Sequence, residues 1–162
     1  MNKSLSKTVS VQKVKKLSIA TLVVTSLFLF LSLLTILFLI ITSAKTAEDM
    51  NVLLQEASKY SAEELASHIA FIYEKNGVAG LVSATAALWI INGILAITTL
   101  VLIIVTLVKA NKLHMQRTQN NELMAKEADS HKKFKILSIV GIFFAPCAIA
   151  GLVIKLKSLP KA

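Results

Sequence analysis

The sequence predicts an all-α, polytopic integral membrane protein with three transmembrane helices and a short extracytoplasmic helical hairpin between the first two. Composition is the first reason: of the 162 residues, 55% are hydrophobic and 17% are charged, whereas soluble domains carry about 25% charged residues. The second reason is that three long runs of the chain contain no ionisable residue. The third is that the basic residues, 18 against 9 acidic ones, lie outside those runs, as they do in membrane proteins.

Each uncharged run is long enough to form a membrane helix. The runs span residues 17–44, 76–108 and 136–154, and a helix needs about 20 apolar residues to cross the hydrocarbon core. Because backbone groups in lipid must be satisfied within their own segment, helices are expected rather than isolated strands. The predicted transmembrane helices are therefore 17–44, 77–108 and 136–154, with the third kinked at Pro146, which has no N–H to donate.

The first run also resembles a secretory signal sequence, because a basic segment precedes it and residues 42–44 are small. The hydrophobic part of a cleaved signal peptide is only about 7–15 residues long. The run 17–44 is much longer, so a retained signal anchor is the preferred interpretation.

The distribution of Lys and Arg predicts the orientation. Segment 1–16 holds five basic residues and connection 109–135 holds seven, whereas connection 45–76 holds three together with six acidic residues. Because positive residues collect on the cytoplasmic side, we expect a plasma-membrane protein with a cytoplasmic N-terminus and with 45–76 outside. Anionic lipid headgroups on the cytoplasmic side are the expected partners of six lysines: Lys13, Lys15, Lys16, Lys132, Lys133 and Lys135.

The C-terminal segment 155–162 allows two topologies. If helix 136–154 crosses, its basic residues lie outside, anchored at the outer headgroups. In the alternative, 136–154 dips into the membrane and returns around Pro146, which leaves the tail inside. A re-entrant backbone must be covered by protein, and this short chain offers little, so we expect the helix to cross.

Connection 45–76 is expected to hold two short amphipathic helices. Residues 46–49 and 61–64 each have a hydroxyl followed three residues later by a carboxylate, which is the spacing of a capping box. Apolar residues follow each box at three-and-four spacing, and Asn76-Gly77 is a typical helix end.

Connection 109–135 is expected to consist of helical extensions of the second and third transmembrane helices, joined by a turn near Asn120. His114 and His131 are interpreted as solvated. Nucleic acid is not an expected partner, because the segment has one Arg and, before Phe134, no aromatic side chain on which a base could stack.

Catalytic chemistry is not expected. The predicted transmembrane helices contain no Lys, Arg, Asp, Glu or His, whereas coupled transporters and intramembrane hydrolases use such groups at membrane depth. The single cysteine, Cys147, leaves no intrachain disulfide and no Cys-based zinc site. Glu64 and His68 are one helical turn apart, but two ligands are too few for a metal. We expect no catalytic residue, no cofactor and no metal.

Small and hydroxylated residues recur at heptad-like spacing along each predicted transmembrane helix. This spacing places them on one face, which suits left-handed helix packing. We call these faces the seams. Asn92 is the strongest candidate, because a lone amide among apolar residues needs a partner. The expected packing residues are Thr25, Ser32, Thr35, Asn92, Ala96, Thr99, Gly141, Ala145 and Ala148.

These features favour a small non-enzymatic scaffold or accessory subunit of a larger membrane complex. Its partners would be other membrane proteins or further copies of the chain. The alternative is an oligomeric pore or permeability protein, holin-like in size and span number only, lined by the Ser and Thr of the seams. A surface antigen or receptor is a third interpretation, although the exterior connection is short for one.

Overall fold

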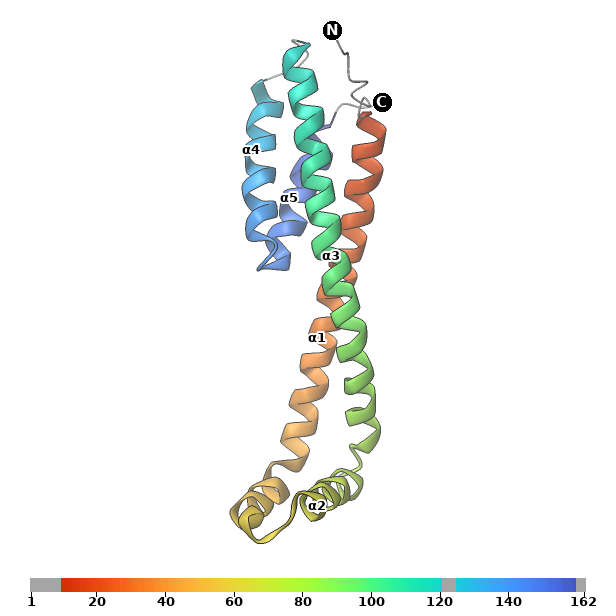
Figure 1. Cartoon of the computed structure of the whole chain (residues 1–162), viewed down its shortest axis with the longest axis vertical. Helices are drawn as coiled ribbons and strands as arrows, with labels where there is room; N and C mark the ends of the chain where they lie inside the picture. The colour runs from red at the N-terminus through yellow and green to blue at the C-terminus, as the bar shows by residue number, and fades with distance from the viewer. Residues whose placement is uncertain (1–9, 121–124, 160–162) are drawn as a thin grey trace. The chain divides into compact units, whose positions relative to one another are not determined.

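The computed structural model describes residues 10–120 and 125–159, and within these ranges every regular element is a helix. The elements are α1 (Val11–Glu56), the 3-10 helix η1 (Ala57–Lys59), α2 (Ala62–Lys75), α3 (Ala79–Gln119), α4 (Ala125–Val140) and α5 (Ala145–Ser158) (Figure 1). The chain divides into two compact units. The first unit comprises Met1–Leu29 and Ile94–Ala162, and the second unit comprises Phe30–Gly93.

Two helices in the described ranges are long and apolar enough to cross a membrane. They are the stretch Val11–Lys59, which contains α1, and α3. With 46 and 41 residues, α1 and α3 extend about 69 and 62 Å at 1.5 Å per residue, well beyond a hydrocarbon core of about 30 Å. The all-helical class is confirmed, whereas a third helix of this kind is not found in the described residues.

Residues 136–154 do not form the single helix that the sequence predicts. α4 ends at Val140, residues 141–144 form a turn, and α5 begins at Ala145. Pro146 stands in the first turn of α5, where its missing N–H removes no helical hydrogen bond. A kink was expected because proline disrupts a helix interior. Instead the helix ends before the proline, the chain reverses direction, and α5 packs back along α4 (Figure 1).

Glycine permits the close approach of α4 and α5, which together form the α4–α5 hairpin. A Cβ atom at Gly141 would lie 2.5 Å from the Cβ atom and the backbone nitrogen of Ala148. A Cβ atom at Gly151 would lie 3.0 Å from the Cβ atom of Leu137. Side chains cannot be accommodated at the first distance, so the hairpin requires glycine at position 141.

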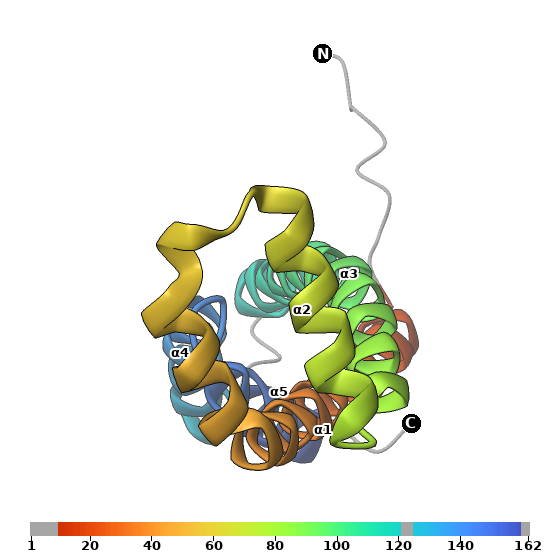
Figure 2. The same cartoon turned by 90° about the horizontal axis from the view of Figure 1, so that it is seen from below.

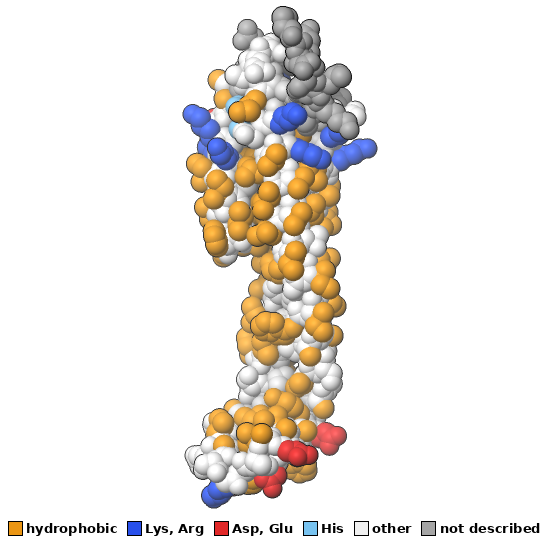
Figure 3. All heavy atoms as spheres, viewed as in Figure 1, with side chains coloured by type: hydrophobic (Ala, Val, Ile, Leu, Met, Phe, Trp, Pro, Cys, Tyr) orange, Lys and Arg blue, Asp and Glu red, His pale blue; other side chains and the backbone are white. Residues whose placement is uncertain are grey.

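The first unit is built around an apolar core to which all its helical segments contribute. Phe134 of α4 is fully buried at its centre. On the visible face of this unit, hydrophobic side chains cover the helices, and Lys and Arg gather at one end (Figure 3). The buried core residues are Val14, Ala110, Leu113, Phe134, Leu152 and Leu159.

In the second unit, α2 begins and ends as the sequence predicts. Ser61 and Glu64 form a complete capping box, with the Ser61 N–H donating to the Glu64 carboxylate at 2.8 Å. The helix ends at Asn76, and Gly77 follows with a positive φ of 64°, a conformation that glycine adopts at little cost. Figure 2 shows the C-terminal part of α1 and α2 as two arms joined through η1.

The other predicted capping box is wrong. Thr46 lies inside α1, and its hydroxyl donates to the carbonyl of Thr42 at 2.9 Å. A threonine bonded in this way to the preceding turn is compatible with a continuous helix. Because no Gly or Pro interrupts 42–56, the first long helix continues into the connection instead of restarting.

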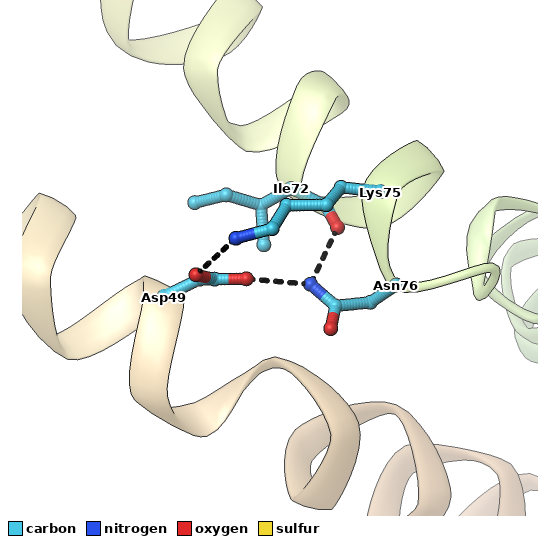
Figure 4. A network of polar contacts seen from close by, with 4 residues as sticks. All are labelled: Asp49, Ile72, Lys75 and Asn76. Carbon is cyan, nitrogen blue, oxygen red and sulfur yellow. Dashed lines mark hydrogen bonds and ion pairs between the residues drawn. The ribbon is translucent and has the colours of Figure 1, made fainter.

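Asp49 links the end of α1 to α2 (Figure 4). Its carboxylate lies 2.7 Å from the Lys75 Nζ atom and accepts a 2.8 Å hydrogen bond from Asn76 Nδ2, which also donates to the Ile72 carbonyl at 2.9 Å. The hydrogen bonds from Lys75 and then Asn76 lower the pKa of Asp49. This network lies over the buried side chain of Ile72.

Candidate functional site

The seam residues are mostly buried within their own unit. In the first unit, the Thr21 and Thr106 hydroxyls are 2.8 Å apart and both residues are fully buried, joining α1 to α3. In the second unit, Asn92 Nδ2 donates to Thr35 Oγ1 at 2.9 Å. Of the predicted packing residues, Thr25, Thr35, Thr99, Gly141 and Ala148 are buried, and Ser32, Asn92, Ala96 and Ala145 are half-buried.

Several seam hydroxyls also bond within their own helix. Thr25 donates to the Thr21 carbonyl at 2.7 Å, Thr35 to Leu31 at 2.8 Å, and Thr85 to Leu81 at 2.7 Å. A hydroxyl satisfied by the preceding turn needs neither water nor a partner chain. This pattern suits close helix packing better than an open polar path.

The six lysines expected at lipid headgroups all have exposed side chains. They lie on α1 and α4, and Lys133 pairs with Asp129 at 2.8 Å. Their exposure leaves their charges available to a membrane surface. The six are Lys13, Lys15, Lys16, Lys132, Lys133 and Lys135.

The first unit also contains a cluster of polar side chains that the sequence analysis did not identify. An ion pair anchors it: Arg117 Nη1 lies 2.8 Å from Glu127 Oε1 and 2.7 Å from Oε2. Both side chains are mostly buried. We call this the polar cluster; its residues are Asn111, His114 and Arg117 of α3, Glu127 and His131 of α4, and Lys155 of α5.

Two histidines of the polar cluster stack on each other. The rings of His114 and His131 are 4.1 Å apart and nearly parallel, at 16°. His131 Nε2 lies 3.3 Å from Asn111 Oδ1. Burial, reinforced by the charge of Lys155, lowers the pKa of His131 to about 4, and burial also lowers the pKa of His114. Both imidazoles are therefore neutral at pH 7.

The expectation that both histidines are solvated is therefore wrong for His131, which is only 4% exposed. Helical spacing shows which residues share a face, but not which neighbour covers that face. His131 is covered because α4 packs beside α3, with Phe134 in the shared core.

Lys155 is the most unusual member of the polar cluster. It is 6% exposed, and no carboxylate of the described residues lies within ion-pair distance of its Nζ atom. Burial lowers its pKa, while Glu127 raises the pKa and Arg117 lowers it further. Because α5 turns back along α4, Lys155 lies near Arg117 and Glu127 and not at the far end of a single helix over 136–154.

The polar cluster could not be assembled from sequence because its residues come from three helices. The available signal was weak: His114 and Arg117 are three residues apart, and Glu127 and His131 are four apart. Each pair thus shares a helix face. Nothing in that spacing indicates that the two faces meet, or that Lys155 reaches them.

A cavity of about 240 Å³ lies in the first unit beside the turn 141–144. Phe28, Ile103 and turn residue Phe143 contribute to its wall. Thr99 lines it as well, and its hydroxyl is buried without a hydrogen-bond partner in the described residues. The lining is otherwise apolar, so the cavity suits an apolar group.

The described residues contain no group of three His, Cys, Asp or Glu side chains placed to hold a metal ion. The pair considered from the sequence is engaged elsewhere: Glu64 caps α2, and the ring of His68 lies 4.6 Å from that of Tyr60. Beside the polar cluster, the Ser158 hydroxyl donates to the Lys155 carbonyl at 2.9 Å. Comparisons of the chain with protein-family models, with curated proteins and with solved structures found no match.

Proposed function

We propose that the chain is an integral plasma-membrane protein. α1 and α3 cross the bilayer, and the α4–α5 hairpin enters and leaves from the cytoplasmic side. The exposed apolar surface supports this: Phe30 is 62% exposed, Ile90 69% and Ile97 68%. Soluble monomers rarely expose contiguous apolar patches above a few hundred Å², whereas lipid accepts such side chains.

The dimensions of the α4–α5 hairpin support a re-entrant segment. Its turn begins six residues after Lys135 and ends eleven residues before Lys155, which corresponds to about 9 and 16 Å of helix. A hydrocarbon core is about 30 Å thick, so the hairpin reaches roughly its middle and returns. Lys155 and Lys157 then lie on the same side as connection 109–135, in agreement with the positive-inside rule.

We propose that the protein acts as a non-enzymatic scaffold or accessory subunit in a larger membrane complex. The observation that carries this proposal is the exposed turn of the hairpin, where Phe143 is 90% exposed. No described backbone N–H donates to the carbonyls of residues 141–143. Irregular backbone at membrane depth persists only where protein or a water-filled cavity covers it. A neighbouring membrane protein would supply that cover.

The seams support this function over the oligomeric pore. A pore lined by the seams needs hydroxyls that face a shared channel. Here Thr21, Thr25 and Thr106 are fully buried inside the first unit, and Thr35 is bonded to Asn92 inside the second. The hydroxyls are thus already used in packing the chain itself.

Site-specific photocrosslinking in the native membrane tests the proposed partner. A photoreactive residue at Phe143 should give one protein adduct of defined mass. The matched control is Ile136, which lies on the same hairpin and is also exposed, and which should react with lipid. Lipid adducts at both positions, with no protein adduct at 143, would contradict the scaffold proposal.

Cysteine labelling tests the topology separately. In a Cys147→Ser background, single cysteines replace Ser61, Gln119 or Lys157, and intact cells are treated with a membrane-impermeant maleimide. We expect labelling at 61 only, because 119 and 157 face the cytoplasm. Labelling at 157 from outside would show that residues 136–154 cross the membrane.

A further inference from the structure

We propose that the first unit binds a small cyclic molecule with one hydroxyl group, a phenol or a cyclic alcohol, in the cavity of about 240 Å³ beside the turn 141–144. Side chains of α1 and α3, the turn itself and the start of α5 form the wall of this cavity. Such a site needs neither the partner protein nor the membrane topology proposed above.

The polar side chain of the cavity is Thr99. It is 6% exposed, and its Oγ1 atom has no hydrogen-bond partner in the described residues. The other four threonines of α3 all make side-chain hydrogen bonds; Thr98, for example, donates to the Ile94 carbonyl at 2.8 Å. Because a buried hydroxyl without a partner is costly, a ligand oxygen that accepts from Thr99 would stabilise the first unit.

The turn brings hydrogen-bond acceptors to the same cavity. Gly141 is buried and contributes backbone atoms to the wall, because glycine has no side chain. Its carbonyl, like those of Ile142 and Phe143, accepts no hydrogen bond from a described backbone N–H. A hydroxyl group both donates and accepts, so one ligand hydroxyl matches both Thr99 and the Gly141 carbonyl. A ketone would match Thr99 alone, and a hydrocarbon would match neither.

The volume of the cavity sets the size of the ligand. An apolar cavity of about 150 Å³ holds benzene. At about 240 Å³, this cavity has room for about ten non-hydrogen atoms, as in thymol, a phenol with a branched alkyl group. Apart from Thr99 the lining is apolar, with Phe28 and Ile103 among its residues. Because largely apolar cavities exclude water, a cyclic alcohol suits this one better than ordered water or a charged molecule.

The turn also provides a way into the cavity. Ile142 and Phe143 line the cavity, yet they are 37% and 90% exposed. The wall that they form therefore lies at the surface of the first unit, whereas Thr99 and Gly141 are buried. A ligand that enters beside the turn would place its hydroxyl group inward.

Thermal unfolding of the full chain in neutral detergent tests the proposal. The probes are thymol and para-cymene, which has the same carbon skeleton without the hydroxyl. At about thirty times its Kd, thymol should raise the Tm by roughly 5 °C through mass action. Because the two probes partition differently into micelles, the affinity for each probe is compared between variants.

Thr99→Val tests the proposed hydrogen bond. It should weaken thymol binding about five- to tenfold, because one hydrogen bond is lost, and it should leave para-cymene binding unchanged or stronger. The variant should fold, because it replaces a hydroxyl that has no partner in the described residues with a methyl group.

A second pair of variants tests the location of the site. Ala96→Leu places a larger side chain in the wall of the cavity and should abolish the binding of both probes. Ala87→Leu is the matched control, because Ala87 is exposed on the same helix and does not line the cavity. It should keep both affinities.

Anomalous scattering from crystals of the wild-type chain grown with para-bromophenol gives a direct readout, even if a variant does not fold. We expect a bromine peak in the cavity and the phenol oxygen beside Thr99 Oγ1. Equal melting temperatures with and without thymol, with no bromine peak in the cavity, would overturn the proposal. So would equal thymol affinities of the wild-type chain and Thr99→Val, or a loss of binding in Ala87→Leu as large as in Ala96→Leu.

Discussion

The two units of the chain are stabilised by different kinds of contact. In the first unit, side chains from four helical segments meet in an apolar core around Phe134. In the second unit, the only apolar side chains buried among the described residues are Leu53, Ile72 and Val78. Its helices are joined instead by polar contacts, from Asp49 to α2 and from Asn92 to Thr35.

The difference shows what the α4–α5 hairpin contributes. Two helices side by side leave most of each surface exposed, so a helix pair cannot enclose a core. In lipid, apolar contacts bring little gain, because the surrounding tails are equally apolar, and hydrogen bonds and close packing matter more. The hairpin supplies two further helices, and the first unit can then bury Phe134 together with a polar cluster.

The largest expected effect comes from removing the centre of the apolar core. Phe134→Ala should destabilise the first unit by about 3–5 kcal/mol, through lost burial and a residual cavity. Hydrogen exchange would show faster exchange in α4 and α5 and unchanged exchange in α2. The matched control, Phe71→Ala in the second unit, changes an exposed side chain and should alter stability by less than about 0.5 kcal/mol. Equal losses in both units would contradict the comparison.

Acid should weaken the first unit by the next largest amount. Burial lowers the pKa of His131 to about 4, against about 6.5 in an unfolded chain. The folded state therefore favours the neutral imidazole. Its stability is complete above about pH 6.5 and falls by up to about 3 kcal/mol as the pH approaches 4. Unfolding free energies measured against pH should flatten in His131→Gln and remain steep in His68→Gln.

Glycine substitutions compare the packing of the units directly. Gly141→Ala should cost about 1–3 kcal/mol, because its Cβ atom would overlap Ala148. Gly93→Ala has nothing within 4 Å of the added Cβ atom and should stabilise its helix by about 0.5–1 kcal/mol. The melting temperatures of both variants, compared with that of the wild-type chain, measure these changes in stability. A neutral Gly141→Ala would mean that α4 and α5 are not held at this distance.

The smallest expected effect is the loss of the polar link in the second unit. Asn92→Leu removes the 2.9 Å hydrogen bond to Thr35 and should cost about 0.6 kcal/mol, the average for interhelical hydrogen bonds in a membrane. A double-mutant cycle with Thr35→Val isolates the pairwise energy. A coupling energy of zero would show that the hydrogen bond between Asn92 and Thr35 does not stabilise the packing of these helices.

The sequence predicted the elements that depend on near neighbours. The capping box at Ser61, the helix end at Asn76-Gly77 and the helices on both sides of Asn120 were all predicted, and the structure has them. The predicted helix start at Thr46 was wrong, because the capping-box spacing also fits a threonine whose hydroxyl bonds to the preceding turn of its own helix. It expected a single helix over 136–154, because an uncharged run does not show where the chain reverses.

The polar cluster could not be predicted from the sequence for a related reason. The lysines expected at headgroups are exposed because their surroundings are set by one helix surface. Lys155 and His131 are buried because other helices cover them. Their charge states therefore follow from contacts between segments far apart in the chain.

The sequence by itself determined the helical class, the two long apolar helices and the ends of α2, because hydrogen bonding within a helix and the length of an apolar run are local properties. Only the tertiary structure decided the direction of α5 and the burial of Lys155 and His131. Those depend on the close approach of Gly141 to Ala148 and on the packing of α4 beside α3. Such long-range contacts form only once the segments have come together, so no local pattern encodes them.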